Sequence, residues 1–352
     1  MQRRELPVQK GRNYVMVRVG MVGFGNIAQA HRQAYWDLEA KGVPVKLTAV
    51  CDIDPSKYTT VLAERVAKGQ SPGLEGIRCY DHMDKMADAE QLDLVDICVP
   101  TPVHAPAAIH MLERGYHVLS EKPMARRYSD CLQMLEAAGA AGRRLMIGQC
   151  VRFFPEYQYL QEVVEDGRYG QVLSAFFDRL AGGMSADRPL TWFGDYAQSG
   201  GALLDLHIHD IDMTRWLFGE PVSVCCTGRG LRTKFDAVNS QLHYGDEKLV
   251  NLTADWSLSG PYPFTARYRV NLEGATLIGE NGAVTVYLRD GESFQPALTG
   301  GTGIANEIEY LVGLIESGGE NYKNPPESAA QTVKLAEALC QSAEKGGEQV
   351  FL

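Results

Sequence analysis

VRVGMVGFGNIAQAH, residues 17–31, is the stretch that decides the fold of the first half of this chain. An apolar, β-branched run leads into Gly23, Gly25 and Ala28, which form the pattern G-x-G-x-x-A, and a helical pattern follows. Gly23 allows a tight turn, Gly25 lets the backbone approach a pyrophosphate, and the small Ala28 allows the helix to pack closely. A plain strand-to-helix turn would also use glycines, so the surrounding pattern decides.

Short apolar runs alternate with longer helical patterns from residue 15 to residue 148. The longer segments carry apolar residues at three- and four-residue steps, which is typical of helices that cover a sheet. This alternation indicates βαβ units and a parallel, doubly wound α/β sheet. We predict its strands at 17–24, 47–53, 94–100, 117–123 and 144–150.

The second half of the chain has a different pattern. A helix and a strand lead to a helix predicted at 202–218, and several strands follow in hairpin-like succession with Gly and Asn-Gly turns. We therefore expect an α+β domain with a mainly antiparallel, open sheet. The length of 352 residues also favours two domains. We predict the first at 15–148, the second at 149–326 and a final helix at 327–345.

The second predicted strand ends at Asp52, which lies 27 residues past Gly25 (52 − 25 = 27). An acid there accepts hydrogen bonds from the hydroxyls of the adenosine ribose and repels a 2′-phosphate. We therefore expect NAD as the cofactor, with NADP less favoured. Asn26 and Ile27 would complete the phosphate site at the start of the helix. The alternative role, an acid that caps the next helix, suits Asp54 better.

Lys122 lies between Glu121 and Pro123 at the end of an apolar strand. An ammonium group is costly to bury there without a partner. Because doubly wound sheets bind ligands at the carboxyl ends of their strands, Lys122 is a candidate donor to a substrate oxygen on which charge develops. A salt-bridged lysine at a strand end is the alternative.

A second candidate site lies in SGGALLDLHIHDIDMTRWLFG, residues 199–219. In one continuous helix, Asp205 and His209 would share a face because they are four residues apart. The carboxylate would then orient the ring and support its charged form, which makes His209 a candidate acceptor for a hydroxyl proton. The alternatives are structural: Asp205, Asp210 and Asp212 would be acids on the helix surface, and His207 would be a half-buried core residue.

Composition and charge exclude several classes of protein. The net charge is −10, which argues against a nucleic-acid binder because such proteins need clustered Lys and Arg. No stretch approaches the ~20 apolar residues of a membrane span, and the start is polar without a signal-peptide core, so we expect a cytoplasmic protein. The segment before Met16 resembles an extension. The eight cysteines lack ligand spacing, so we expect neither disulfides nor a metal site.

Six sequence blocks resemble the glucose-fructose oxidoreductase/inositol dehydrogenase family, often written Gfo/Idh/MocA. They occur in the family's order and extend from Val17 to about Leu352. The resemblance implies a Rossmann domain followed by an open, mainly antiparallel sheet domain, with the final helix packed back on the first domain. The blocks are GMVGFGNIAQAH, AVCDIDP, DICVPTPVHAPAAIHMLERGYHVLSEKPMA, GQCVRFFPEY, GGALLDLHIHDIDMTRWLFG and the closing helix that ends SAEKGGEQVFL.

The resemblance also implies roles for individual residues. Lys122 matches the family's catalytic lysine, and its bond to Pro123 would be cis. Asp205 and His209 match the pair that binds substrate and relays the proton. His207 departs from the small residue common at its position, which predicts an extra polar wall in the pocket. The residues that match positions near the cofactor are Thr101, Pro102, His104 and Glu121, which line the nicotinamide and its ribose, and Arg152.

The implied reaction is reversible hydride transfer between nicotinamide and a carbinol carbon of a sugar, inositol or related polyol. His209 would take the hydroxyl proton, Lys122 would polarise the oxygen and Asp205 would position both. The alternatives on this scaffold are a glycosidase that uses NAD transiently and a non-catalytic protein that senses the cofactor. An exposed sheet face in the second domain would need to be covered, so we expect a homodimer or homotetramer.

Overall fold

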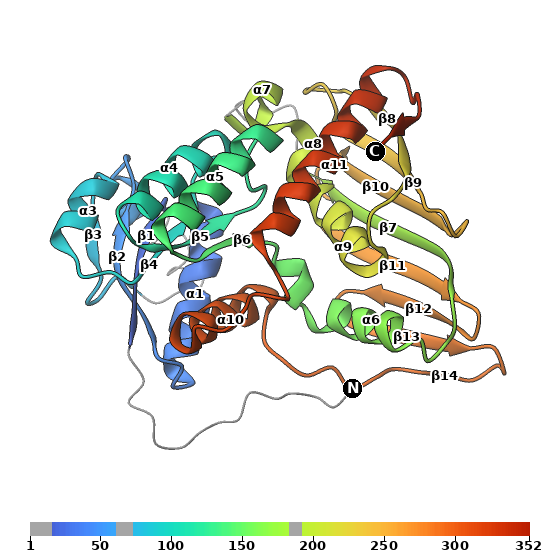
Figure 1. The fold of residues 1–352 in the computed structure, drawn as a ribbon, viewed down its shortest axis with the longest axis horizontal. Helices are drawn as coiled ribbons and strands as arrows, with labels where there is room; N and C mark the ends of the chain where they lie inside the picture. The colour runs from blue at the N-terminus through green and yellow to red at the C-terminus, as the bar shows by residue number, and fades with distance from the viewer. Residues whose placement is uncertain (1–15, 61–72, 183–191) are drawn as a thin grey trace.

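A computed structural model of the chain describes residues 16–60, 73–182 and 192–352. Two sheets dominate the structure, and Figure 1 shows them on opposite sides of the molecule, with α10 (Gly303–Ser317) and α11 (Pro326–Glu344) between them. Within the described ranges, every helix is too short or too polar to span a bilayer.

The first sheet has six parallel strands in the order β3-β2-β1-β4-β5-β6. The order reverses between β1 and β4, which places a ligand-binding crevice at the carboxyl ends of these strands. The predicted doubly wound sheet is confirmed, but β3 was missed because its three residues carry no apolar pattern. The strands are β1 (Val17–Val22), β2 (Val45–Cys51), β3 (Arg78–Tyr80), β4 (Leu94–Ile97), β5 (His117–Glu121) and β6 (Leu145–Gly148).

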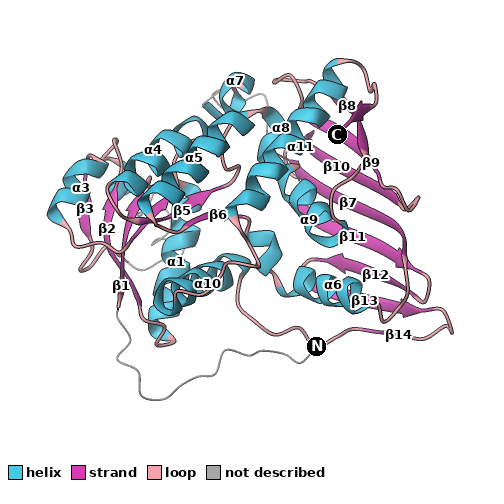
Figure 2. Ribbon diagram, viewed as in Figure 1, coloured by secondary structure: helices cyan, strands magenta, loops and turns pink. Residues whose placement is uncertain are grey.

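Helices cover both faces of the first sheet (Figure 2). On one face α1 (Asn26–Ala40) packs against α10, and on the other lie α3 (Met83–Ala89), α4 (Thr101–Glu113) and α5 (Tyr128–Ala141). The apolar side chains of α10, among them Ile308 and Leu311, join the core of the first sheet. The prediction that the whole of 149–326 belongs to the second domain is therefore wrong for α10.

The second sheet has nine strands in the order β14-β13-β12-β11-β7-β10-β9-β8-β15. Its pairs are antiparallel except for β7 and β10, which confirms the predicted mainly antiparallel sheet. The strands are β7 (Val172–Gly182), β8 (Ser223–Arg229), β9 (Ala237–His243), β10 (Leu249–Leu258), β11 (Thr265–Leu272), β12 (Ala275–Glu280), β13 (Ala283–Leu288), β14 (Ser293–Phe294) and β15 (Val350–Phe351).

One face of the second sheet is covered by α6 (Pro155–Asp166), α8 (Gly201–Asp205), α9 (Ile208–Phe218) and part of α11, with the short α7 (Tyr196–Ser199) at its edge (Figure 2). Helix α11 joins the two domains, because Ala329 and Val333 lie in the core of the first sheet and Leu335 and Leu339 in that of the second. The position of this last helix beside the first domain agrees with the expectation from the family resemblance.

The helix predicted at 202–218 is interrupted. The carbonyl of Ala202 accepts hydrogen bonds from the backbone N–H groups of Leu206 and His207, at 3.0 and 2.8 Å, so the second of these bonds spans five residues. This wide turn ends α8 at Asp205, and α9 begins at Ile208. Wide turns of this kind are frequent at functional sites. The premise that Asp205 and His209 share one continuous helix face is therefore wrong.

Candidate active site

The loop after β1 has the geometry of a phosphate cradle. Gly23 has φ +96°, and a Cβ atom there would meet the carbonyl oxygen of Cys98 at 2.3 Å, so no other residue fits. A Cβ on Gly25 would meet nothing within 4 Å, which leaves its backbone open. Helix α1 then begins with exposed Asn26 and Ile27 and has no side-chain cap. Its free backbone N–H groups suit the phosphates of a dinucleotide.

Asp52 lies just after β2 and is tied to this loop. Its Oδ2 accepts the backbone N–H of Phe24 at 2.8 Å. Both carboxylate oxygens also accept from Lys57, at 3.0 and 2.9 Å. Asp54 accepts the backbone N–H of Ser56 at 3.1 Å, which fits the capping role considered for it. The acid proposed for the ribose therefore stands beside both the glycine loop and a cation.

Lys122 reaches across from the first domain to the second. Its Nζ donates to the main-chain oxygen of Asp205 at 2.6 Å and lies 3.2 Å from Asp205 Oδ1. Both side chains are partly exposed, at 16% and 22%. The Lys122-Pro123 bond is cis, as the family resemblance implied. The lysine at the end of β5 and the acid at the end of α8 thus form one interdomain contact.

His209 lies in the first turn of α9 and is half-buried. Burial lowers its pKa well below the usual value, and the charges of Lys122 and Arg179 lower it further. Its buried Nδ1 has no hydrogen-bond partner in the described structure. The expectation that Asp205 supports the charged form of His209 is therefore wrong: Asp205 binds Lys122, and the imidazole is neutral at physiological pH.

Arg179 is a charged neighbour of this site that the sequence analysis missed. It projects inward from β7 among apolar residues and pairs with Asp210 at 2.8 Å. An arginine at an inward position of an alternating strand was the available signal. Asp210 and Asp212 are therefore not surface acids; both are 1% exposed, and Asp212 pairs with Arg152 at 2.6 Å.

Two residues expected near the cofactor, His104 and Arg152, form hydrogen bonds within the protein. The ring nitrogens of His104 lie 2.8 and 2.9 Å from the carbonyl oxygens of Pro123 and Val99, so its polar atoms face the backbone. Arg152 is 1% exposed and donates to Asp212 and to α11 at Ser328. Both side chains are thus held by partners within the protein, and their contact with the cofactor stays a prediction.

The expectation that His207 adds a polar wall to the pocket is wrong. It is fully buried, and its Nε2 lies 2.8 Å from Ser240 Oγ on β9. The ring therefore connects the wide turn to the second sheet and forms no extra polar wall in a substrate pocket.

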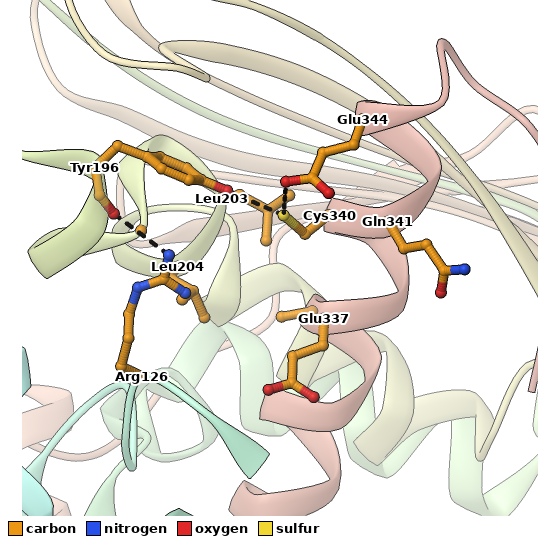
Figure 3. Close-up of a pocket in the computed structure, with 10 residues that line it drawn as sticks. Arg126, Tyr196, Leu203, Leu204, Glu337, Cys340, Gln341 and Glu344 are labelled. Carbon is orange, nitrogen blue, oxygen red and sulfur yellow. Dashed lines mark hydrogen bonds between the residues drawn. The ribbon is translucent and has the colours of Figure 1, made fainter. Parts of the chain in front are cut away.

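Two pockets of the described structure share Arg126 as a lining residue. Figure 3 shows the first, of about 140 Å³, in which Arg126 points toward Tyr196 beside α11. The second, of about 300 Å³, is lined in part by Thr101, Pro102 and again Arg126. Lys122, Asp205 and His209 line neither pocket, whereas Arg126, which follows Lys122 by four residues, lines both.

Two family models match the chain. The one described as "Oxidoreductase family, NAD-binding Rossmann fold" matches residues 17–149, and the one described as "GFO/IDH/MocA C-terminal domain" matches residues 157–285. Inositol 2-dehydrogenase of Rhizobium meliloti (strain 1021) is 30% identical over 349 residues, which cover 94% of this chain and 98% of that protein.

Two further similarities concern part of the chain and the fold. The 2,7-anhydro-N-acetylneuraminate hydratase of Escherichia coli (strain K12) is 30% identical over 189 residues, 51% of this chain and 50% of that protein. The solved structure of a levoglucosan dehydrogenase in complex with NADH and levoglucosan has a TM-score of 0.81 at 20% identity, and covers 95% of this chain and 99% of that one.

Proposed function

Because the chain belongs to the Gfo/Idh/MocA oxidoreductase family, whose first domain binds NAD, we propose that it oxidises a CH–OH group of a sugar, inositol or related polyol, or reduces the matching ketone. The observation that carries this proposal is the contact between Lys122 and Asp205, with a neutral histidine close by. The substrate class follows from relatives that act on cyclic polyols and sugars.

The residues of the chain supply the binding and proton chemistry of this reaction. When bound, the nicotinamide of NAD accepts a hydride from the carbinol carbon and returns it in the reverse direction. An ammonium group has three N–H donors. Lys122 directs two toward Asp205 and keeps one for the substrate oxygen, where it would stabilise the charge that develops as the hydride leaves. His209, neutral and next to this cation, would accept the hydroxyl proton.

The described geometry supports a set of cofactor contacts. We propose that the phosphates lie over Gly25, Asn26 and Ile27, and that Asp52 accepts the ribose hydroxyls after sharing or releasing Lys57. At the nicotinamide end we propose contacts with residues at the carboxyl ends of β4 and β5, namely Thr101, Pro102, Glu121 and Lys122.

A substrate screen tests this proposal. Sugars, inositols and sugar acids are offered with NAD or NADP while the absorbance of the reduced cofactor is followed. We expect turnover with at least one polyol and a preference for NAD. No turnover with any compound, by a protein that still binds NAD, would contradict the proposed oxidation.

A reaction without net oxidation is the second candidate. The 30% identity to a hydratase over half the chain favours it over the cofactor-sensing alternative. In this case the NAD would be reduced and reoxidised within one turnover. The sign would be product formation from an anhydro-sugar or glycoside without accumulation of free NADH.

The surface of the second sheet supports an assembly of several copies of the chain. On the outer face of the second sheet, Phe176 and Ile278 are half-buried and Tyr287 is exposed, which supports a homodimer or homotetramer formed over this face. Light scattering coupled to size exclusion would test the assembly, and a monomer at micromolar concentration would contradict it.

All eight cysteines are free, which supports a reducing, cytoplasmic location.

A further inference from the structure

Behind Lys122 lies a buried row of polar side chains, of which the proposed function uses only Glu121. His31 on α1 is fully buried, with Nδ1 2.9 Å from Asp96 Oδ2 and Nε2 2.9 Å from Glu121 Oε1. Tyr35, one turn further along α1, donates its hydroxyl to the same Asp96 oxygen at 2.9 Å. The row therefore joins a helix to the ends of two adjacent central strands, β4 and β5.

The chemistry of the row fixes the protonation of His31. Each ring nitrogen faces a carboxyl oxygen, and because an ionised carboxylate can only accept, two ionised partners require that both nitrogens carry protons. Burial by itself lowers the pKa of the ring, but Asp96, together with Cys98 beside it, outweighs burial and holds that pKa well above the usual value. The favoured species is an imidazolium between two carboxylates, because buried charges are tolerated when they are paired and hydrogen-bonded.

Glu121 extends this row to the active site. Its Oε1 binds His31, and its Oε2 accepts the backbone N–H of Lys122 at 3.0 Å. The pKa of the Glu121 carboxyl is lowered: burial opposes ionisation, but the hydrogen bond and the charge of His31 outweigh it. One carboxylate thus holds the main chain of the lysine whose ammonium group reaches Asp205 on the other side.

We infer that His31 is a positioning residue, which as an imidazolium holds Glu121 and through it the backbone of Lys122 in the place that the reaction requires. This inference rests on the proposed function, because the reaction gives Lys122 its task. His31 itself lies behind Glu121 and touches neither substrate nor cofactor.

The other ionisable side chains that face the row are uncharged, which supports a positive charge on His31. Cys98 lies 3.5 Å from Asp96 Oδ1, and its pKa is raised to about 12, chiefly by burial, so it is a neutral thiol. From α10, Glu307 faces the row; burial and the nearby Glu121 raise its pKa well above the usual value, and it is neutral too. Burial likewise raises the pKa of Tyr35 and, beyond β6, that of the Cys150 thiol, which faces Glu121. His31 and Lys122 are then the cations that balance Asp96 and Glu121.

A metal ion is the competing explanation for part of this cluster. Ligand atoms of His31, Asp96 and Cys98 lie within 4.8 Å of one another. A metal would need an unprotonated ring nitrogen, whereas both nitrogens of His31 are hydrogen-bonded to carboxylates on opposite sides. A hydrogen-bonded imidazolium therefore explains the positions of both Asp96 and Glu121, whereas a metal ion would explain only that of Asp96.

The test has one measurement on the unmodified protein and one on variants. Ring ¹⁵N NMR of histidine-labelled protein should show a signal with both nitrogens protonated at pH 8, which shifts in Asp96→Asn and vanishes in His31→Gln. A neutral His31 ring at pH 8 would overturn the inference. This spectrum needs no turnover, so it decides on His31 even if the proposed oxidation is absent.

The kinetic measurement separates positioning from binding. We expect His31→Gln to lower kcat on the order of 10²-fold, as misplacement by about 1 Å does elsewhere, with little change in the KM for NAD. His117→Gln, at the far end of the same strand β5, is the matched control and should keep the kcat of the unmodified enzyme. A folded His31→Gln variant with undiminished kcat would also overturn the inference.

Discussion

The ammonium group of Lys122 lies 2.6 Å from the main-chain oxygen of Asp205 and 3.2 Å from its carboxylate. Lys122 follows a strand of the first sheet, whereas Asp205 ends a helix that packs on the second. A change in the angle between the two domains would therefore move the ammonium group of Lys122 relative to Asp205. We predict that Asp205→Asn lowers kcat/KM about 10²-fold, because the amide keeps the shape but loses the charge that holds the ammonium. Asp195→Asn, in which an exposed acid that caps α7 is changed, is the control and should retain full activity.

His209 should give a characteristic pH profile. Its pKa lies well below 6.5, so the ring is already unprotonated at neutral pH. If His209 is the base, its ring stays unprotonated between pH 6.5 and 8, so it should cause no change of the oxidation rate in this range. The rate should fall only at lower pH, where the ring takes up a proton. His209→Gln should lower kcat by about 10²- to 10⁴-fold. An ascending limb in the unmodified enzyme centred near pH 7 that disappears in His209→Gln would contradict this.

The two glycines of the cradle should respond differently to one methyl group. Gly23→Ala places a Cβ 2.3 Å from the oxygen of Cys98, so the variant should be destabilised and lose NAD. Gly25→Ala meets no neighbour within 4 Å, so its melting temperature should match that of the unmodified protein while NAD binding weakens at least tenfold. Thermal melting and calorimetric titration with NAD provide the two readouts. Unchanged NAD affinity in Gly25→Ala would place the phosphates elsewhere.

Cofactor choice should depend on the pair formed by Asp52 and Lys57. Asp52→Ala removes the acceptor for the ribose and leaves Lys57 free to attract a 2′-phosphate, so the ratio of kcat/KM for NAD to that for NADP should fall at least tenfold. The double change that also removes Lys57 should bind NADP less well than Asp52→Ala alone. Asp54→Ala is the control. An unchanged preference in Asp52→Ala would contradict the assignment of the ribose contact.

The stability of the fold should decline in acid partly through His207. Burial lowers the pKa of His207 to about 3, with a smaller contribution from Arg179. The unfolded chain takes up this proton near pH 6.5 but the folded chain does not, so the free energy of unfolding falls as the pH drops from about 6.5 to about 3. The slope from one such group is up to about 1.4 kcal/mol per pH unit. Urea unfolding should show a shallower slope in His207→Gln, whereas a change of the exposed His82 should leave the slope unchanged.

The sequence predicted what depends on periodicity and local motifs. The parallel sheet, the glycine cradle and the strand-end position of Lys122 follow from apolar runs and glycine spacing, and the structure has all three. The three-residue strand β3 was beyond this reach, because it pairs with β2 without an apolar pattern of its own. The interruption between α8 and α9 depends on the hydrogen bond from the backbone N–H of His207 to the carbonyl of Ala202. Residue patterns do not specify this bond.

Partners distant in sequence account for the remaining differences. His104 with Pro123, and His31 with Asp96 and Glu121 become visible only when the strands are placed side by side. A signal was present for the last of these. His31 stands on the apolar face of α1 and Asp96 within an apolar strand, and buried charged groups require partners.

The central claim is that hydride transfer depends on Lys122 at the contact between the domains. The most direct measurement is the reduction of NAD by the best polyol of the screen, deuterated at the carbinol carbon, with the unmodified enzyme and with Lys122→Ala. We predict that deuterium appears in the reduced nicotinamide and that the rate falls at least 10²-fold in Lys122→Ala, without loss of NAD binding. Equal rates for the two proteins, or deuterium released to water, would contradict the account.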